Sequence, residues 1–208
     1  MLPMAQFWIA FAAVFVVVDP LGAVPAFAAL TRDRAPAEIR GVARRAALVG
    51  ALILAVFAAL GPPLLGALGV SRPAFQVAGG VLLFLAALEM LRGKAAACRC
   101  GPADLEAARR RDDIAIVPVA IPMLAGPGAL TTVMGQIHAA PGVDGVVATY
   151  AAIAATFALA YPILRGATLL QRLLGASALT VIQRVLGLIL AALSIQTAVT
   201  GLARLLAA

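Results

Sequence analysis

Long apolar segments alternate with short polar connections along the whole chain. Six of these segments hold about 20 mostly apolar residues, the length that an α-helix needs to cross the hydrocarbon core of a bilayer. They cover residues 6–30, 46–68, 75–91, 114–136, 146–164 and 181–202. The pattern predicts an all-α integral membrane protein with six transmembrane helices, forming a single transmembrane domain over residues 1–208.

The composition supports lipid as the solvent of this fold. Hydrophobic residues make up 63% of the chain and charged residues 12%, whereas a soluble domain has about 45–50% and about 25%. The net charge of +7 does not indicate a nucleic-acid partner, because the basic residues form no stripe interleaved with aromatic residues. The sequence contains no catalytic or phosphate-loop motif, so we expect neither an enzyme nor a cofactor or metal site.

Basic residues fall in alternate connections. The first, third and fifth connections are rich in arginine, whereas the second has only Arg72 and the fourth has none. The positive-inside rule places basic connections in the cytoplasm. We therefore expect both termini outside and the longest connection, residues 93–113, in the cytoplasm. Its two cysteines, Cys98 and Cys100, are expected to be free thiols, because a lone pair of this spacing is a weak metal signal.

Two of the six segments are interrupted at matching depth. Pro20 lies about 14 residues into the first segment and Pro127 about 13 into the fourth, so both interruptions fall near the bilayer centre. A division into repeat one (about 1–92) and repeat two (about 114–208) gives three segments each, in opposite orientation. The chain thus reads as a 3+3 inverted repeat whose first and fourth helices are broken near the midplane, a pattern that points to a transporter site.

Broken helices expose backbone groups that hydrocarbon cannot satisfy. Proline removes an N–H group and glycine permits unusual backbone geometry, so carbonyl and N–H groups are freed at both breaks. They must face protein or a watery cavity. Freed N–H groups at a helix N-terminus suit a carboxylate, and freed carbonyls suit an ammonium group or a cation. Two facing breaks would hold a small zwitterion.

Asp19 is the one acidic residue near the centre of a segment. A carboxylate at that depth is costly and indicates function, either by binding an ammonium group or a cation or by carrying a coupling proton. A structural cap on its own broken helix explains it equally well. Gly79 and Gly80 are expected to pack closely against a broken helix. A further set of polar residues either lines a pathway or joins helices: Gln76, Thr131, Thr132, Gln136, Gln183, Ser194 and Gln196.

Four stretches together resemble the MarC family of bacterial and archaeal inner-membrane proteins. They are DPLGAVPAFAALT (residues 19–31), FQVAGGVLLFLAALEML (75–91), DIAIVPVAIPMLAGPGALTTV (113–133) and VIQRVLGLILAAL (181–193). The resemblance covers nearly the whole chain, in order. It implies substrate-binding residues on the first segment, namely Asp19, Pro20, Gly22 and Pro25, and on the fourth, namely Gly126, Pro127, Gly128 and Thr131. Ala23 belongs to the same site and stands where relatives often have asparagine, a residue that this chain lacks.

The family belongs with LysE-like permeases, and its SnatA-type members transport small neutral amino acids. The resemblance therefore implies secondary active transport of glycine and alanine by alternating access, with the zwitterion held between two broken helices. It favours protons over sodium as the coupling ion and places the protein in the cytoplasmic membrane. Two alternatives stay open: a LysE-like exporter of another small solute, and a membrane regulatory protein that transports nothing.

Overall fold

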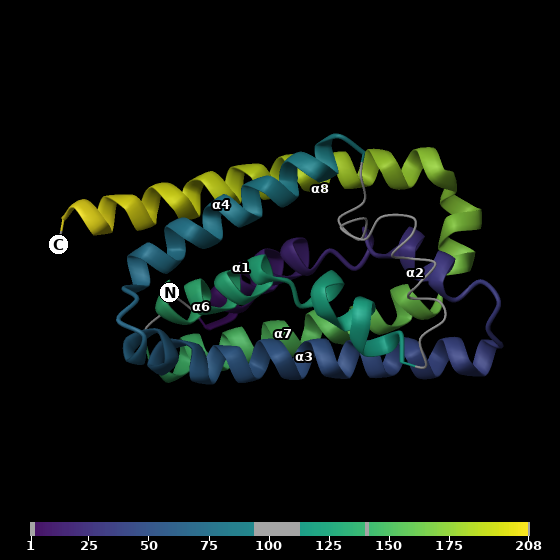
Figure 1. Cartoon of the computed structure of the whole chain (residues 1–208), viewed down its shortest axis with the longest axis horizontal. Coiled ribbons are helices and arrows are strands. Elements are labelled where there is room, and N and C mark those ends of the chain that lie inside the picture. Colours follow the sequence, from purple (N-terminus) through teal and green to yellow (C-terminus); the bar gives the residue numbers. More distant parts are fainter. Residues whose placement is uncertain (1–2, 94–112, 140–141, 208) are drawn as a thin grey trace.

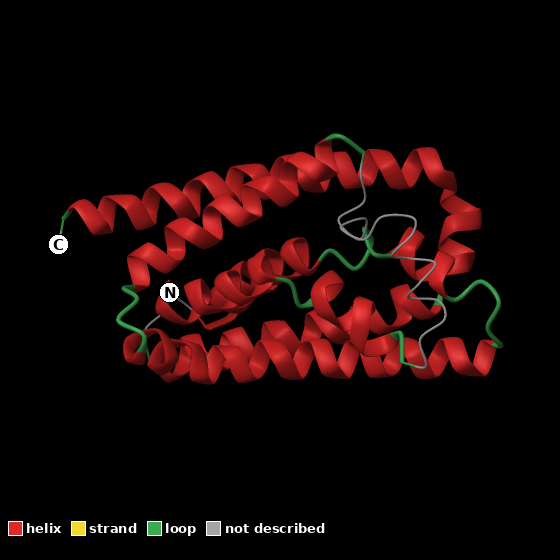
Figure 2. Ribbon diagram, in the orientation of Figure 1, coloured by secondary structure: helices red, strands yellow, loops and turns green. Residues whose placement is uncertain are grey.

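The computed structural model describes residues 3–93, 113–139 and 142–207, and these residues form helices joined by short turns (Figure 1). In chain order the helices are α1 (Pro3–Val18), α2 (Val24–Leu30), α3 (Pro36–Ala67), α4 (Arg72–Leu91), η2 (Ala115–Leu124), α6 (Pro127–Ala139), α7 (Val143–Arg165) and α8 (Ala167–Leu206). No strand occurs in the described part of the chain (Figure 2). The predicted all-α class is confirmed.

The helices form three layers. α3 and α7 lie side by side on one face, and α4 and α8 lie side by side on the opposite face (Figure 1). The shorter elements α1, α2, η2 and α6 lie between these pairs. The N-terminal end of α1 and the C-terminal end of α8 point toward the same end of the bundle, whereas the turn between α2 and α3 lies at the other end (Figure 1).

Four helices are long and apolar enough to cross a bilayer: α3, α4, α7 and the Ser177–Leu206 part of α8. The pair η2 and α6, bent by 55° at its break, makes a fifth candidate. The predicted segment 6–30 is divided between α1 and α2, each shorter than a full span. The structure therefore supports a helical membrane protein with four or five candidate spans, counted over the described residues.

The outer face of α3 carries the exposed apolar side chains that a lipid-facing helix requires. Its large apolar side chains recur every four residues and are all exposed: Leu48, Leu52, Val56, Leu60 and Leu64. Small residues cover the opposite side of the helix, where Ala43, Ala46 and Gly50 are buried. Small residues allow close approach between helices, while lipid solvates the leucines. Gly50, for example, packs against the ring of Phe157 on α7.

The connection predicted between residues 164 and 181 is wrong in one respect, because most of it is helical. α8 begins at Ala167, directly after Gly166, and bends at Gly175, whose φ is 72°. Ala167 is buried and Leu170 is half-buried, while Arg172 is exposed, so the segment forms about two amphipathic turns before the bend. The φ and ψ of Gly175, 72° and 165°, are a combination that is essentially restricted to glycine. Residues 94–112, with Cys98, Cys100 and the third basic connection, lie outside the described residues.

Candidate functional site

The first break is the turn Asp19–Ala23 between α1 and α2. Asp19 ends α1 with a φ of 44°, a left-handed conformation in which aspartate and asparagine are enriched among non-glycine residues. Its carboxylate oxygen Oδ1 accepts a hydrogen bond of 2.9 Å from the Gly22 N–H group. Asp19 thus bonds one N–H group of the turn between the helices, whereas the N-cap of α2 is Ala23, which makes no side-chain cap bond. The second oxygen, Oδ2, is buried and has no hydrogen-bond partner among the described residues.

Gly22 is required by the position of that carboxylate. A Cβ atom built on Gly22 would overlap the Asp19 Oδ2 atom and its carboxyl carbon. The residue is also buried, as are Pro20 and Ala23 beside it. The absent side chain thus allows the carboxylate to fold back over the turn.

Helix α8 reaches the same turn from the other half of the chain. The side-chain amide of Gln183 donates a hydrogen bond of 3.5 Å to the carbonyl oxygen of Gly22. Gln183 is only 3% exposed, and one of the freed carbonyls of the break is thereby paired. The sequence analysis named Gln183 among several polar residues that either line a pathway or join helices. The sequence feature that could have indicated its contact with the break is a side-chain amide within an apolar segment.

The second break separates η2 from α6. The backbone is extended at Val117 and at Ile121, and each of these residues precedes a proline, which disfavours the α conformation. The chain then turns at Ala125 and Gly126, and α6 starts at Pro127. The Gly126 carbonyl accepts hydrogen bonds from Ala129 and Leu130 in the first turn of α6. The irregular path of η2 was not predicted, although Pro118 and Pro122 are visible in the sequence.

Helix α4 packs on the first turns of α6 through glycine and leucine. A Cβ atom on Gly79 would collide with the side chain of Thr131, so the expected close packing against a broken helix is confirmed for Gly79. For Gly80 it is wrong, because Gly80 packs against Ala198 on α8. Leu83, one turn further along α4, lies against Gly128. The Thr131 hydroxyl donates to the carbonyls of Pro127 and Gly128, so its hydrogen is used within its own helix.

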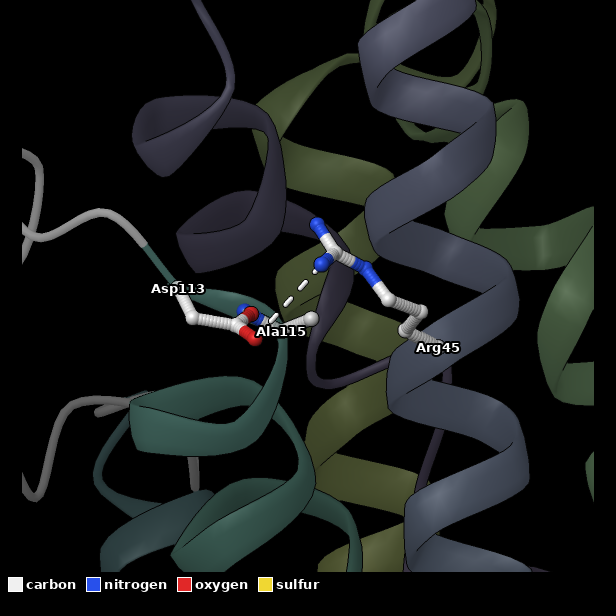
Figure 3. Close-up of polar contacts among 3 residues, drawn as sticks. All are labelled: Arg45, Asp113 and Ala115. Carbon is white, nitrogen blue, oxygen red and sulfur yellow. Dashed lines mark hydrogen bonds and ion pairs between the residues drawn. The ribbon is translucent and has the colours of Figure 1, made fainter.

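An ion pair holds the start of η2 against α3. The Arg45 guanidinium lies 3.5 Å from Asp113 Oδ2, while Asp113 Oδ1 accepts a hydrogen bond of 3.1 Å from the Ala115 N–H group (Figure 3). Both charged side chains are about half exposed. Exposed pairs contribute about 0–1 kcal/mol, so this contact positions η2 more than it stabilises the bundle.

A small cavity of ≈ 40 Å³ joins the two breaks, and we call it the central cavity. Asp19 lines it from the first break, and Pro122, Gly126 and Gly128 line it from the second. Leu83 and other apolar side chains of α1, α4 and α8 complete the wall. The space suits about one to three water molecules, and is too small for a whole amino acid. Any larger ligand needs a wall residue or a helix to move.

The other predicted site residues lie outside the central cavity. Pro25 lines a separate cavity of ≈ 690 Å³ with Arg32 and Arg172. Thr131 lines two cavities on the other side of Leu83, and Pro127 is exposed. The structure thus brings together Asp19, Gly126 and Gly128, supported by Gly22, and places the remaining predicted residues around them.

Comparison with known proteins identifies the family. A family model described as MarC family integral membrane protein matches residues 4–206. The chain belongs to the MarC family. A UPF0056 membrane protein of Aquifex aeolicus is 36% identical over 197 residues, covering 95% of this chain and 92% of that protein. The UPF0056 membrane protein YvbG of Bacillus subtilis is 32% identical, covering 92% of each.

Similar proteins occur in archaea as well as in bacteria. The UPF0056 membrane protein MJ1677 of Methanocaldococcus jannaschii is 35% identical, covering 94% of this chain and 95% of that protein. No solved structure matches this chain. The family and the apolar helices together establish a membrane protein, and the central cavity is the feature from which its chemistry is argued.

Proposed function

We propose that this MarC protein is a secondary active transporter of small neutral amino acids, with glycine and alanine as substrates and protons as the coupling ion. It would span the cytoplasmic membrane six times, with α1 and α2 together forming the first span and both termini outside. The two halves would form a 3+3 inverted repeat. Alternating access would expose the central cavity to each side in turn.

The observation that carries this proposal is the unpartnered Asp19 oxygen in the central cavity. Asp19 is 4% exposed, and its Oδ2 atom has no donor among the described residues. A buried charge is retained only when it is paired or has a function. An ammonium group would supply both the charge and the donor that Oδ2 lacks. A coupling proton on the same carboxyl group would neutralise it when no substrate is bound.

The second break offers the complementary group. Gly128 lies in the first turn of α6, where backbone N–H groups have no acceptor within the helix. The helix dipole favours negative charge at that end. A substrate carboxylate would therefore lie near Gly128 while its ammonium group meets Asp19, and both residues line the central cavity. This arrangement suits a zwitterion better than a simple cation or anion.

The wall of the central cavity favours small side chains. Glycine lines it at positions 126 and 128, and the apolar side chains of Leu83, Met90 and Met123 close the remaining sides. A larger amino acid would displace several of these packed residues, whereas glycine or alanine needs the smallest expansion. Packed interiors resist added volume at a cost of about 1–3 kcal/mol.

The layered arrangement supports the inverted repeat. Each half contributes one interrupted element to the middle layer, one helix to the α3–α7 face and one helix to the α4–α8 face. The breaks of the two halves then meet at the central cavity. Paired interruptions in the two halves of a membrane protein are the pattern found around midplane substrate sites.

Reconstitution tests the proposal directly. Purified protein in liposomes is expected to accumulate labelled glycine and alanine when a pH gradient is imposed, and to lose accumulation when a protonophore collapses the gradient. Protein-free liposomes are the control, and a sodium gradient at constant pH is the competing condition. The absence of uptake and of exchange across a broad amino-acid panel would overturn the amino-acid proposal.

A further inference from the structure

A vestibule with several polar side chains in a mainly apolar wall lies on the other side of Leu83 from Asp19. It consists of two adjoining cavities of ≈ 250 Å³ and ≈ 190 Å³, and both are lined by Gln76, Thr131, Gly135 and Arg204. Its walls come from α4, α6 and the C-terminal part of α8, with a contribution from α1. Arg72 begins α4 and Arg204 lies near the end of α8, and these helix ends lie at the end of the bundle toward which both termini point (Figure 1).

The vestibule holds a positive charge and an unused acceptor. Arg72 and Arg204 line the larger cavity, both are exposed, and neither forms an ion pair within the described part of the chain. Deeper in α4, the Oε1 atom of Gln76 is buried and lacks a hydrogen-bond partner among the described residues. A buried acceptor without a donor is costly, and a bound ligand or water would remove that cost.

The vestibule and the central cavity are separated by two side chains. Val17 and Leu83 line both the smaller vestibule cavity and the central cavity. Leu83 is 3% exposed and rests on Gly128. The side chains of Val17 and Leu83 therefore form the barrier between a solute in the vestibule and Asp19.

We propose that the vestibule is a second binding site for a small zwitterion, occupied before the central cavity. The guanidinium groups of Arg72 and Arg204 hold the carboxylate, and Gln76 Oε1 accepts a hydrogen bond from the ammonium group. An anion without an ammonium group would leave Gln76 unpaired, which is why the chemistry favours a zwitterion. The identity of that zwitterion as glycine or alanine rests on the proposed function.

Cysteine labelling tests the site without requiring transport. Thr200 lines the smaller cavity and is replaced by Thr200→Cys in a Cys98→Ser, Cys100→Ser background. An anionic thiosulfonate is expected to label it about tenfold faster than a cationic one, the low end of the effect of charged clefts on association. Arg204→Gln should reduce the ratio of the anionic to the cationic labelling rate severalfold. Arg172→Gln, at an exposed position in the ≈ 690 Å³ cavity, is the matched control and should leave the ratio unchanged.

Protection by substrate gives the second readout. Glycine or alanine at millimolar concentration should slow labelling of Thr200→Cys, and acetate at the same concentration should protect less. Gln76→Leu should abolish the difference between glycine and acetate while keeping the preference for the anionic reagent. Monodisperse elution of each variant shows that it is folded.

The outcomes separate this site from the transport proposal. Protection by glycine in protein that shows no liposome uptake keeps the vestibule site and rejects transport. Uptake without any protection, or labelling with no preference for the anionic reagent, rejects the vestibule site and leaves transport standing. Equal protection by acetate and glycine rejects the zwitterion as its ligand.

Discussion

The side-chain amide of Gln183 on α8 lies 3.5 Å from the carbonyl oxygen of Gly22, 161 residues away in the sequence. This contact links the first break to a helix of the other half of the chain. Because the distance is at the long end for a hydrogen bond, its value lies in pairing a buried carbonyl that would otherwise face apolar side chains. The break is thus held by α8 as well as by its own hydrogen bond from Gly22 to Asp19.

Replacing Gln183 should therefore destabilise the protein. Gln183→Leu keeps the approximate volume but removes this long hydrogen bond, so the loss should lie near the low end of the roughly 0.5–1.5 kcal/mol that a hydrogen bond contributes, about 0.5 kcal/mol. We expect a lower apparent melting temperature in detergent. Gln171→Leu, at an exposed position on the same helix, is the control and should change it little. Equal melting temperatures for the two variants would show that the Gln183 contact contributes nothing.

A methyl group at Gly22 should disturb the site itself. Gly22→Ala places Cβ on the Asp19 carboxylate, so the carboxylate must leave its present position, at a cost of about 1–3 kcal/mol. We expect glycine uptake to fall sharply. Gly41→Ala on α3 is the control, because its Cβ would meet nothing within 4 Å, and alanine in a helix interior is favoured over glycine by about 0.5–1 kcal/mol. Full uptake by Gly22→Ala would contradict the position assigned to Asp19.

Local backbone chemistry explains which parts of this site were predictable from the sequence. Proline and glycine act on the conformation of their own segment. The helices α1 and η2 accordingly end at Val18 and Leu124, just before the Asp19–Pro20 and Gly126–Pro127 pairs. The preference of aspartate for a cap likewise operates within the turn that contains Asp19. These features depend on neighbours in the sequence and need no knowledge of the packing.

Features that depend on packing were not predictable in the same way. Gln183 and Gln196 have the same local signal, an amide in an apolar helix, yet Gln183 is buried against the first break and Gln196 is exposed in α8. Leu83 has no local signal at all, although it separates two cavities. Arg165 and Arg172 indicated a non-helical connection between two membrane spans. Arg172 instead lies on the exposed face of helix α8. Spatial neighbours decide each of these roles.

The contact between Gly79 and Thr131 should appear as energetic coupling. Gly79→Ala forces its Cβ into the Thr131 side chain. Thr131→Ala removes the Cγ2 and Oγ1 atoms from this clash but keeps the Thr131 Cβ, so the double variant should recover part of the lost stability. Contacting residues show coupling energies of about 0.5–3 kcal/mol. Apparent unfolding of the two single variants and the double variant measures this value. Additive effects would mean that α4 and α6 do not touch at this point.

Removing the Leu83 side chain should open the central cavity to the vestibule. Ala129 lines the central cavity and is buried, so Ala129→Cys in a Cys98→Ser, Cys100→Ser background reports access to it. Leu83→Ala should speed labelling of this cysteine severalfold, at a stability cost of about 2–5 kcal/mol. Leu85→Ala, at an exposed position on the same helix, is the control. Equal labelling rates in the two variants would place the barrier elsewhere.

Asp19→Asn separates the capping role of Asp19 from its charge. Asparagine retains an oxygen for the Gly22 N–H group and is enriched in the left-handed conformation that residue 19 adopts, so folding should be preserved. The charge that would pair with an ammonium group is lost. Since a hydrogen bond to a charged group contributes about 1.5–3 kcal/mol, we expect glycine uptake at subsaturating concentration to fall by about one to two orders of magnitude.

The pH dependence of uptake decides whether Asp19 also carries the coupling proton. A carboxyl group that gains and loses a proton in each cycle makes uptake sensitive to pH, and an amide cannot replace it in that role. The residual uptake of Asp19→Asn should therefore vary little with pH, whereas Asp144→Asn, at an exposed position in the first turn of α7, should retain the wild-type profile. An Asp19→Asn variant that keeps the wild-type pH profile excludes Asp19 as the proton carrier, and its carboxylate then serves the substrate and the turn alone.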